Sequence, residues 1–445
     1  MQEICARYRT DRLERKRMKR EAEFITAEAL TAAGFDARPA FLRSAEHLIY
    51  SSPATLAFNS PGAEGFGVKR AGLAIPGSVM LIVSPGCCGR DTTLISRIPA
   101  YDHRFFYYDL EENDIVTGKH LSKIAEAAAE IVRSLPEKPS VLMICITCVD
   151  ALLGTDMERV CRRAQEAAGI PVRPCYMYAL TREGTRPPMV HVRESLYGLL
   201  EARPRRSADV NILGYFSPLK ADCELYELLR QVGVRRIREI STCESYEDFQ
   251  RMAGAHFNLL LNPEGRFAAK DLSDRLGIPY IELTRLHDPE RIRRQYRALG
   301  QVLGVTFDDK PYYEAAKEAQ YHFAAAHGDL RIAVGERINA DPFELSLALT
   351  GAGLRISEIY GTVTEENFSW IRALSALSPD TKIYSNLEPT MLHYDAAASD
   401  VTFALGADAC YYHPDVPGIG WNSEVQPFGY TGLCGMYREM EEALS

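Results

Sequence analysis

The feature that most constrains the fold is an alternation of short, almost wholly apolar runs with segments of helical periodicity. The first series contains predicted strands at 78–86 (SVMLIVSPG), 140–148 (SVLMICITC) and 170–178 (IPVRPCYMY). Between them lie predicted helices at 119–135 and 156–169. Continuous apolar runs are typical of strands buried on both faces, and strands that alternate with helices form parallel sheets. The sequence therefore predicts an α/β fold with parallel sheets.

The same alternation begins twice more along the chain. A second series has predicted strands at 210–216, 257–262 and 278–283, followed by a helical region at 289–327. A third has predicted strands at 330–336, 382–386 and 408–414 (DACYYHP) and ends in a helix. The polar segment EARPRRSAD (201–209) is interpreted as a linker. A length of 445 residues fits two to four domains at about 100–200 residues each. We expect three domains, at 1–205, 206–328 and 329–445.

The N-terminal charge run indicates a solvated helix face more than a binding site. It extends from Arg7 to Arg20 and continues into EAEFITAEALTAAG, which predicts a helix ending at Gly34. The charged start has no apolar core of a signal peptide, and no stretch approaches the roughly 18–20 apolar residues of a membrane span. A cytoplasmic protein with no membrane partner is expected.

Charge and motifs exclude further classes. A net charge of −9 disfavours a nucleic-acid partner. No G-x-G-x-x-G follows the first strand of any series, and G-x-x-x-x-G-K-[ST] is absent. We therefore expect no NAD cofactor and no ATP hydrolysis by this chain alone.

Cysteine usage points to the chemistry. The chain has eleven cysteines, an odd number, and a disulfide framework is disfavoured. Cys87 and Cys88 follow the predicted strand at 78–86, and Cys145 and Cys148 close the one at 140–148. Carboxyl ends of parallel strands meet at one edge of a sheet. Thiolates gathered there suit an iron–sulfur cluster or zinc, which the spacing does not separate.

The spacing also leaves alternatives open. Residues three apart in a strand point to opposite faces, so Cys145 and Cys148 can bind one metal only if the strand has ended by Cys148. Otherwise Cys145 is a buried core thiol. All four cysteines could also be packing residues.

Five stretches, in order from about residue 59 to the C-terminus, resemble the nitrogenase component 1 superfamily. They are VMLIVSPGCCG, LEENDIVTGKHLSKIAEA, ICITCVDALLGTDMERV, FNLLLNPEGRFAAKDLSDRLGIPYIEL and VQPFGYTGLCGMYREMEEAL. The resemblance implies three Rossmann-like parallel-sheet domains around a central cleft. It places Cys88 and Cys148 on two of the family's cluster cysteines.

The sequence departs from the family pattern upstream of Cys88. The family's first cluster cysteine is missing there, where FNSPGAEGFG offers Asn59, Ser60 and Gly62. In one hypothesis Cys87, Cys88, Cys145 and Cys148 together hold a single [4Fe–4S] cluster. In the other, Cys88 and Cys148 bind a cluster shared with another subunit.

The resemblance also locates the cofactor ligands of nitrogenase, a cysteine and a histidine. They fall on or near Asn262 and near Phe428, and neither side chain replaces the lost ligand. We expect no nitrogenase-type molybdenum cofactor and no dinitrogen reduction. The cleft could instead hold an organic or tetrapyrrole substrate.

Three residues are candidates for substrate contact or proton transfer. His191 and Arg193 are expected in a loop after the strand at 170–178, together with Arg182 and Arg186, where they could bind carboxylates. His413 follows the last predicted strand and could donate a proton. Glu336, Arg337 and Glu388 also follow strands.

The resemblance implies a reductase component working under reducing, anaerobic conditions. An ATP-dependent iron–sulfur reductase would deliver electrons, and the cluster would pass them to a small molecule other than dinitrogen. A homologous or identical subunit would complete a dimer or tetramer. The alternative is a scaffold for metal-cofactor assembly, and a third interpretation is a solute-binding module.

Overall fold

The computed structural model describes residues 21–43, 67–86, 95–177 and 187–445, and its strands form three sheets. The chain divides into two compact units by its internal contacts. One comprises residues 61–326 and 422–442, and the other 1–60, 327–421 and 443–445. Each unit is considered by itself.

The first sheet has four parallel strands in the order β3-β2-β4-β5. These are β2 (Val79–Ser84), β3 (Phe105–Asp109), β4 (Leu142–Ile146) and β5 (Val172–Tyr176). The accompanying helices are α4 (Val68–Gly72), α6 (Glu112–Thr117), α7 (His120–Ser134), α8 (Cys148–Leu153), α9 (Met157–Ala168) and α10 (Pro188–Tyr197).

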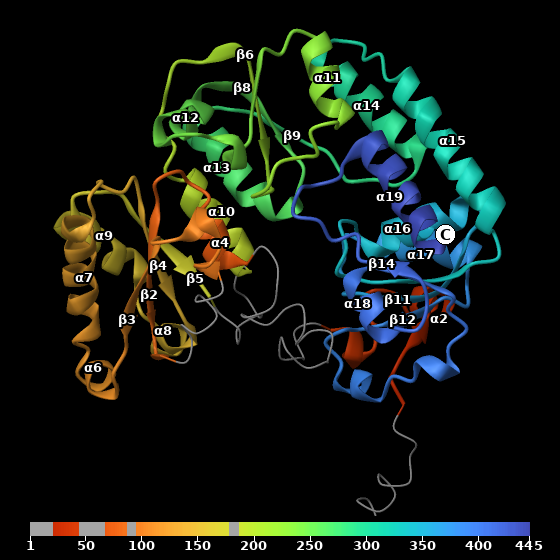
Figure 1. Cartoon of the computed structure of the whole chain (residues 1–445), viewed down its shortest axis with the longest axis horizontal. Helices are drawn as coiled ribbons and strands as arrows, with labels where there is room; N and C mark the ends of the chain where they lie inside the picture. Colours follow the sequence, from red (N-terminus) through yellow and green to blue (C-terminus); the bar gives the residue numbers. More distant parts are fainter. Residues whose placement is uncertain (1–20, 44–66, 87–94, 178–186) are drawn as a thin grey trace, which may run out of the picture. The chain divides into compact units, whose positions relative to one another are not determined.

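Helices cover both faces of this sheet, with α7 and α9 on one side and α4 and α10 on the other (Figure 1). Alternate residues of each strand supply the two cores. Leu142, Ile144 and Ile146 pack toward α7 and α9, whereas Met143 and Cys145 pack toward α4 and α10. Burial on both faces explains why the strands read as unbroken apolar runs.

The second sheet, in the same unit, is also parallel, with the order β7-β6-β8-β9. Its strands are β6 (Arg206–Leu213), β7 (Arg236–Arg238), β8 (Ala255–Leu260) and β9 (Tyr280–Glu282). The helices here are α11 (Glu224–Gln231), α12 (Tyr246–Gln250), α13 (Arg266–Leu276), α14 (Pro289–Leu303), α15 (Lys310–His327) and α19 (Gly429–Leu444). The core on the Cys145 face of the first sheet continues into this sheet through Leu213 and Leu260.

The third sheet lies in the other unit, in the order β1-β12-β11-β10-β13-β14. Its strands are β1 (Ile25–Thr26), β10 (Arg331–Val334), β11 (Arg355–Tyr360), β12 (Lys382–Tyr384), β13 (Phe403–Leu405) and β14 (Gly418–Ile419). All pairings are parallel except that of β1 with β12. The helices are α2 (Ala27–Ala33), α16 (Pro342–Gly351), α17 (Phe368–Leu377) and α18 (Ala407–Tyr412). Short 3-10 turns include η7 (Pro263–Gly265) and η8 (Pro389–His393).

The parallel α/β architecture predicted from the sequence is confirmed, but four local predictions are wrong. In the described residues the N-terminal helix, α2, ends before Gly34 as predicted but begins only at Ala27, because Ile25 and Thr26 extend the third sheet and the Thr26 side chain caps the helix by accepting from the Ala29 N–H at 3.2 Å. The segment 408–414 lies largely in α18, and the strand is β13 just before it. The expected linker already contains the start of β6, and the expected loop around His191 and Arg193 is the helix α10. The three-domain division stays a prediction.

Candidate metal centre

The candidate site lies where β2 and β4 end. These strands are adjacent and parallel, with Val83 opposite Ile146 in the last paired register. Cys87 and Cys88 come three and four residues after the end of β2, and they lie outside the described residues. Cys148 begins α8 immediately after β4. Three of the four predicted thiol positions therefore follow the ends of neighbouring strands along the chain.

Cys148 meets the condition that the sequence left open. The last residue of β4 is Ile146, so the strand has ended before Cys148. Its side chain is partly exposed, unlike the buried Thr147 before it. Alternation along a strand therefore no longer dictates where its thiol points.

Cys145 has a different environment. It lies within β4, opposite Cys175 of β5, and both side chains are completely buried. A hydrogen bond with Cys145, together with burial, raises the pKa of the Cys175 thiol well above its usual value of 9. The Cys175 sulfur also lies 3.6 Å from the carbonyl oxygen of Val68 in α4. This environment is that of a core thiol, and the role of Cys145 as a ligand stays a prediction.

Asp150, on the same helix as Cys148, belongs to a buried polar network. Asp150, two residues further along α8, is 1% exposed, and its Oδ1 accepts from the Thr155 hydroxyl at 2.9 Å. The Nε2 atom of His120, at the start of α7, lies 3.6 Å from the same Oδ1. Burial raises the pKa of Asp150 above its usual value of 3.8. Neither residue was predicted from the sequence. Asp150 is the more unusual of the two, because charged side chains are rarely buried in this way.

Among the residues that the structure describes, no group of three or more His, Cys, Asp or Glu side chains is arranged to hold a metal ion. The positions of Asn59, Ser60, Cys87 and Cys88 fall outside that part of the chain.

Arg193 is held by the fold. From α10 its Nε donates to the carbonyl oxygen of Gly214 at 2.7 Å, and Nη1 donates to that of Met189 at 2.6 Å. It also pairs with Glu264 at 2.9 Å, and its guanidinium lies 4.6 Å from the ring centroid of Phe216. The side chain is 3% exposed, so these contacts account for a buried charge. They join α10 to the ends of the second sheet.

His191 lies two residues before Arg193 on the same helix. Its ring contacts Tyr176 of β5, with the centroids 4.9 Å apart, and its Nδ1 lies 3.7 Å from an Oε2 atom of Glu194. The predicted partners Arg182 and Arg186 lie outside the described residues. A carboxylate-binding role for His191 and Arg193 stays a prediction.

His413 lies in the other unit, within a buried cluster. Its Nε2 is 2.9 Å from the hydroxyls of both Tyr360 and Tyr394. Each hydroxyl also lies within 2.7 Å of Oε2 of Glu358, to which it donates. Since each phenol has one proton, the imidazole donates to the phenol oxygens. Burial alone would raise the pKa of Glu358, but the neighbouring His413 ring and hydrogen bonds from Tyr394, Tyr360 and Ser399 outweigh burial and lower that pKa to about 2. A proton-donor role for His413 stays a prediction.

The remaining candidate residues that follow strands make hydrogen bonds that stabilise the local loops. The backbone N–H groups of Glu336 and Arg337 donate to the buried carboxylate of Asp408 at 2.8 and 2.9 Å. Glu388 caps η8 by accepting from the Thr390 N–H.

The two positions matched to nitrogenase cofactor ligands also have structural roles. The Asn262 side chain caps η7 by accepting from the Glu264 N–H at 3.0 Å. Phe428, just before α19, is 2% exposed. Neither offers a metal-ligating atom of the type that a cysteine or a histidine would supply.

Comparisons with known proteins identify the family of this chain. The family model described as nitrogenase component 1 type oxidoreductase matches residues 64–412. The chain belongs to this family. The match covers all four strands of the first sheet, including the ends of β2 and β4 that carry the candidate site.

Several curated relatives of this nitrogenase component 1 type chain are cofactor biosynthesis proteins. The nitrogenase iron-molybdenum cofactor biosynthesis protein NifE of Nostoc is 27% identical over 358 residues, covering 76% of this chain and 73% of the relative. The Klebsiella pneumoniae protein of that name is 27% identical over 56% of this chain and 58% of its own length. The nitrogenase molybdenum-iron protein alpha chain of Methanosarcina barkeri is 24% identical over 49% of this chain and 45% of its own length.

A solved structure described as "Nitrogenase Cp1 at pH 6.5" has the same fold. It aligns with a TM-score of 0.66 and 16% identity, over 89% of this chain and 93% of that one. This structure confirms the fold, and the family model confirms the family resemblance predicted from the sequence. No helix in the described part of the chain is both long and apolar enough to cross a membrane.

Proposed function

We propose that this protein is a scaffold on which an iron–sulfur precursor of a metal cofactor is held and then passed on. The observation that carries the proposal is the pairing of two features. The chain is similar along 76% of its length to a cofactor biosynthesis protein. Both positions matched to the cofactor ligands of nitrogenase hold side chains that cannot bind metal as cysteine or histidine would.

The second feature favours transient cargo over a permanent catalytic cofactor. A resident cofactor needs fixed protein ligands. A precursor that must be released dissociates more readily when few protein ligands hold it. Asn262 is committed to capping η7, and Phe428 is committed to the core. A molybdenum-type cofactor held as in nitrogenase is therefore not part of the proposal.

The resident metal site in this proposal uses Cys88 and Cys148. Their thiolates are the donors that iron–sulfur clusters prefer, and such a cluster would supply one-electron transfer. Cys148 fits this role, because it begins α8 at a strand end and is partly exposed. Cys145 would have to leave a completely buried position beside Cys175 to join it. We therefore favour a cluster completed by a homologous or identical subunit over one held by four thiolates of this chain.

A second function remains a candidate because the matched family is one of oxidoreductases. In that function an ATP-dependent iron–sulfur reductase would dock, and the cluster would pass electrons to a small molecule. The two functions share the cluster site and differ in what leaves the protein. A scaffold releases metal, whereas a reductase retains metal and releases electrons.

The test follows that difference. The protein is purified under anaerobic conditions, loaded with ⁵⁵Fe and sulfide, and incubated with cofactor-free nitrogenase molybdenum–iron protein as the acceptor. Scaffold function predicts that labelled iron moves to the acceptor together with sulfide. Retention of all label through repeated reduction and oxidation, with consumption of reductant, would reject the scaffold in favour of the reductase.

A further inference from the structure

The helix that presents Cys148 is anchored in an unusual way. α8 has six residues, and Leu152 and Leu153 on it are 75% and 50% exposed. Among the α8 side chains that the structure describes, only Asp150 is buried. A short helix is normally held by apolar side chains, because packing supplies most of its stability. Here Val149 is partly buried against the apolar core, and the one fully buried side chain among those described is a carboxylate.

Within the part of the chain that the structure describes, three buried polar atoms at or beside this carboxylate have no hydrogen-bond partner. They are Thr147 Oγ1, Asp150 Oδ2 and His120 Nε2. Buried polar atoms are rarely left unpaired, because each loses its hydration without compensation. Such atoms indicate an arrangement kept for a reason other than stability. Thr147 and Asp150 lie within two residues of Cys148 in the sequence, and His120 is the histidine that faces Asp150.

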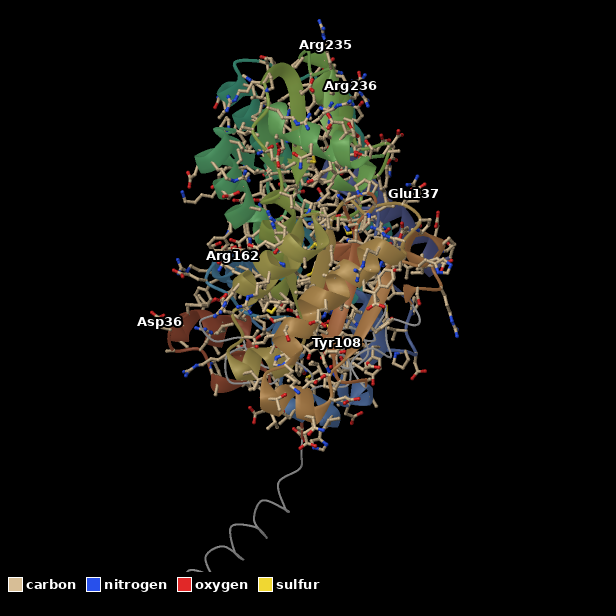
Figure 2. All side chains as sticks on the ribbon, turned by 90° about the vertical axis from the view of Figure 1, so that its left-hand side faces the viewer. Asp36, Tyr108, Glu137, Arg162, Arg235 and Arg236 are labelled. Atoms are coloured by element: carbon tan, nitrogen blue, oxygen red, sulfur yellow. The ribbon has the colours of Figure 1, made fainter. Side chains whose placement is uncertain are left out.

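The orientation of the His120 ring is fixed from its other side. Its Nδ1 lies 3.2 Å from the carbonyl oxygen of Asp114, which can only accept, so Nδ1 carries the proton. The Nε2 atom consequently faces Asp150. The Asp114 carboxylate is itself held by Lys123 and by Tyr108 of β3, each at 2.7 Å. Figure 2 labels Tyr108 among the side chains of this region. A chain of polar contacts thus leads from β3 and α7 to α8.

We propose that His120 and Asp150 are positioning residues that fix α8 and so aim the thiol of Cys148 at its metal. The inference rests on the proposed function only in using Cys148 as a ligand. The pair connects α8 to the start of α7, a fifteen-residue helix packed on the sheet. Residues that orient metal ligands in this way change metal affinity about 10- to 100-fold when replaced.

The experiment compares His120→Phe, His120→Asn and Asp150→Asn with Cys148→Ser and with a matched control, His287→Gln. The Phe variant keeps the ring and removes both nitrogens, whereas Asn can still donate to the Asp114 carbonyl. His287 is a buried histidine between β9 and α14. Thermal unfolding identifies variants that fold.

Two readouts separate positioning from stability. The first is the affinity for iron and the electron paramagnetic resonance spectrum of the reduced, loaded protein. We expect His120→Phe and Asp150→Asn to lose iron affinity by about 10- to 100-fold and to alter the spectrum. His120→Asn should recover part of the affinity, and His287→Gln should retain the wild-type values. Folded His120→Phe and Asp150→Asn proteins with wild-type affinity and spectrum would overturn the proposal.

The second readout needs no metal. In the iron-free protein, alkylation of Cys148 by iodoacetamide is followed by peptide mass spectrometry. Loss of the anchor should speed alkylation at Cys148 several-fold and leave Cys434 on α19 unchanged. An unchanged rate at Cys148 would reject the anchor. If wild-type protein binds no iron, the proposed function fails, while this second readout still tests the positioning.

Discussion

Cys145 and Cys175 lie opposite one another on β4 and β5, both side chains are completely buried, and each thiol shifts the pKa of the other. Cys145 therefore pairs with Cys175 in the core, whereas Cys148, three residues later, is partly exposed. A test of Cys145 distinguishes a cluster held by four thiolates of this chain from one shared with another subunit.

We predict that Cys145→Ser retains the iron content of the wild type, whereas Cys148→Ser loses it. Serine in place of Cys145 brings a more polar hydroxyl into an apolar core and should cost about 1–3 kcal/mol of unfolding free energy. Cys175→Ser serves as the matched control, with a similar loss of stability. Iron quantification and urea unfolding measure both effects. Loss of iron in Cys145→Ser, but not in Cys175→Ser, would favour four thiolates from one chain.

The buried carboxylate of Glu224 holds the start of α19. It accepts from the backbone N–H groups of Tyr430 and Thr431 at 2.7 and 3.1 Å and from the Tyr296 hydroxyl at 2.7 Å. We predict that Glu224→Ala, which leaves these donors unpaired, costs about 3–5 kcal/mol, and that Glu224→Gln costs less. Denaturant unfolding checks the order. Equal losses in both variants would contradict this order, because they would show that the volume and the one acceptor oxygen that Gln retains contribute nothing.

Glu358 predicts a loss of stability in acid. Its pKa is lowered from its usual 4.5 to about 2, so the folded state releases this proton more readily than the unfolded state. The resulting stabilisation, roughly 3 kcal/mol, is present above pH 4.5 and is lost as the pH falls from 4.5 toward 2.

We therefore expect the difference in unfolding free energy between wild type and Glu358→Gln to shrink between pH 5 and pH 3. Urea unfolding at several pH values measures it, and the comparison cancels the titration of other carboxyls. A difference that does not vary with pH would contradict the lowered pKa.

The contacts of Arg193 predict that its replacement destabilises the fold. A role as a substrate ligand would not predict this loss of stability. Its guanidinium donates to two backbone carbonyls and pairs with Glu264. Lysine cannot reproduce this forked geometry, so Arg193→Lys should cost about 2–4 kcal/mol. Glu264→Gln should cost less, because Glu264 is 43% exposed. An Arg193→Lys protein as stable as the wild type would return Arg193 to the candidates for substrate contact.

The helices and strands predicted best are those whose apolar side chains recur with a clear period along the sequence. The apolar runs that became β2, β4 and β5, and the amphipathic helices α7 and α9, follow from hydrophobic periodicity alone. The strands β1, β3, β7, β11 and β14 were not predicted. β1, β7 and β14 have two or three residues and carry little periodic signal, whereas β3 and β11 have five and six residues that mix polar with apolar side chains, so long-range pairing decides them.

The sequence by itself determined the α/β class, the family and the position of thiols after two successive strands, because these depend on local patterns and on order along the chain. Only the tertiary structure decided that β2 and β4 are neighbours, that Cys145 is paired with Cys175, and that Asp150 faces His120. Each of these relationships joins residues tens of positions apart. Burial and pairing across such distances arise from packing, which no local pattern records.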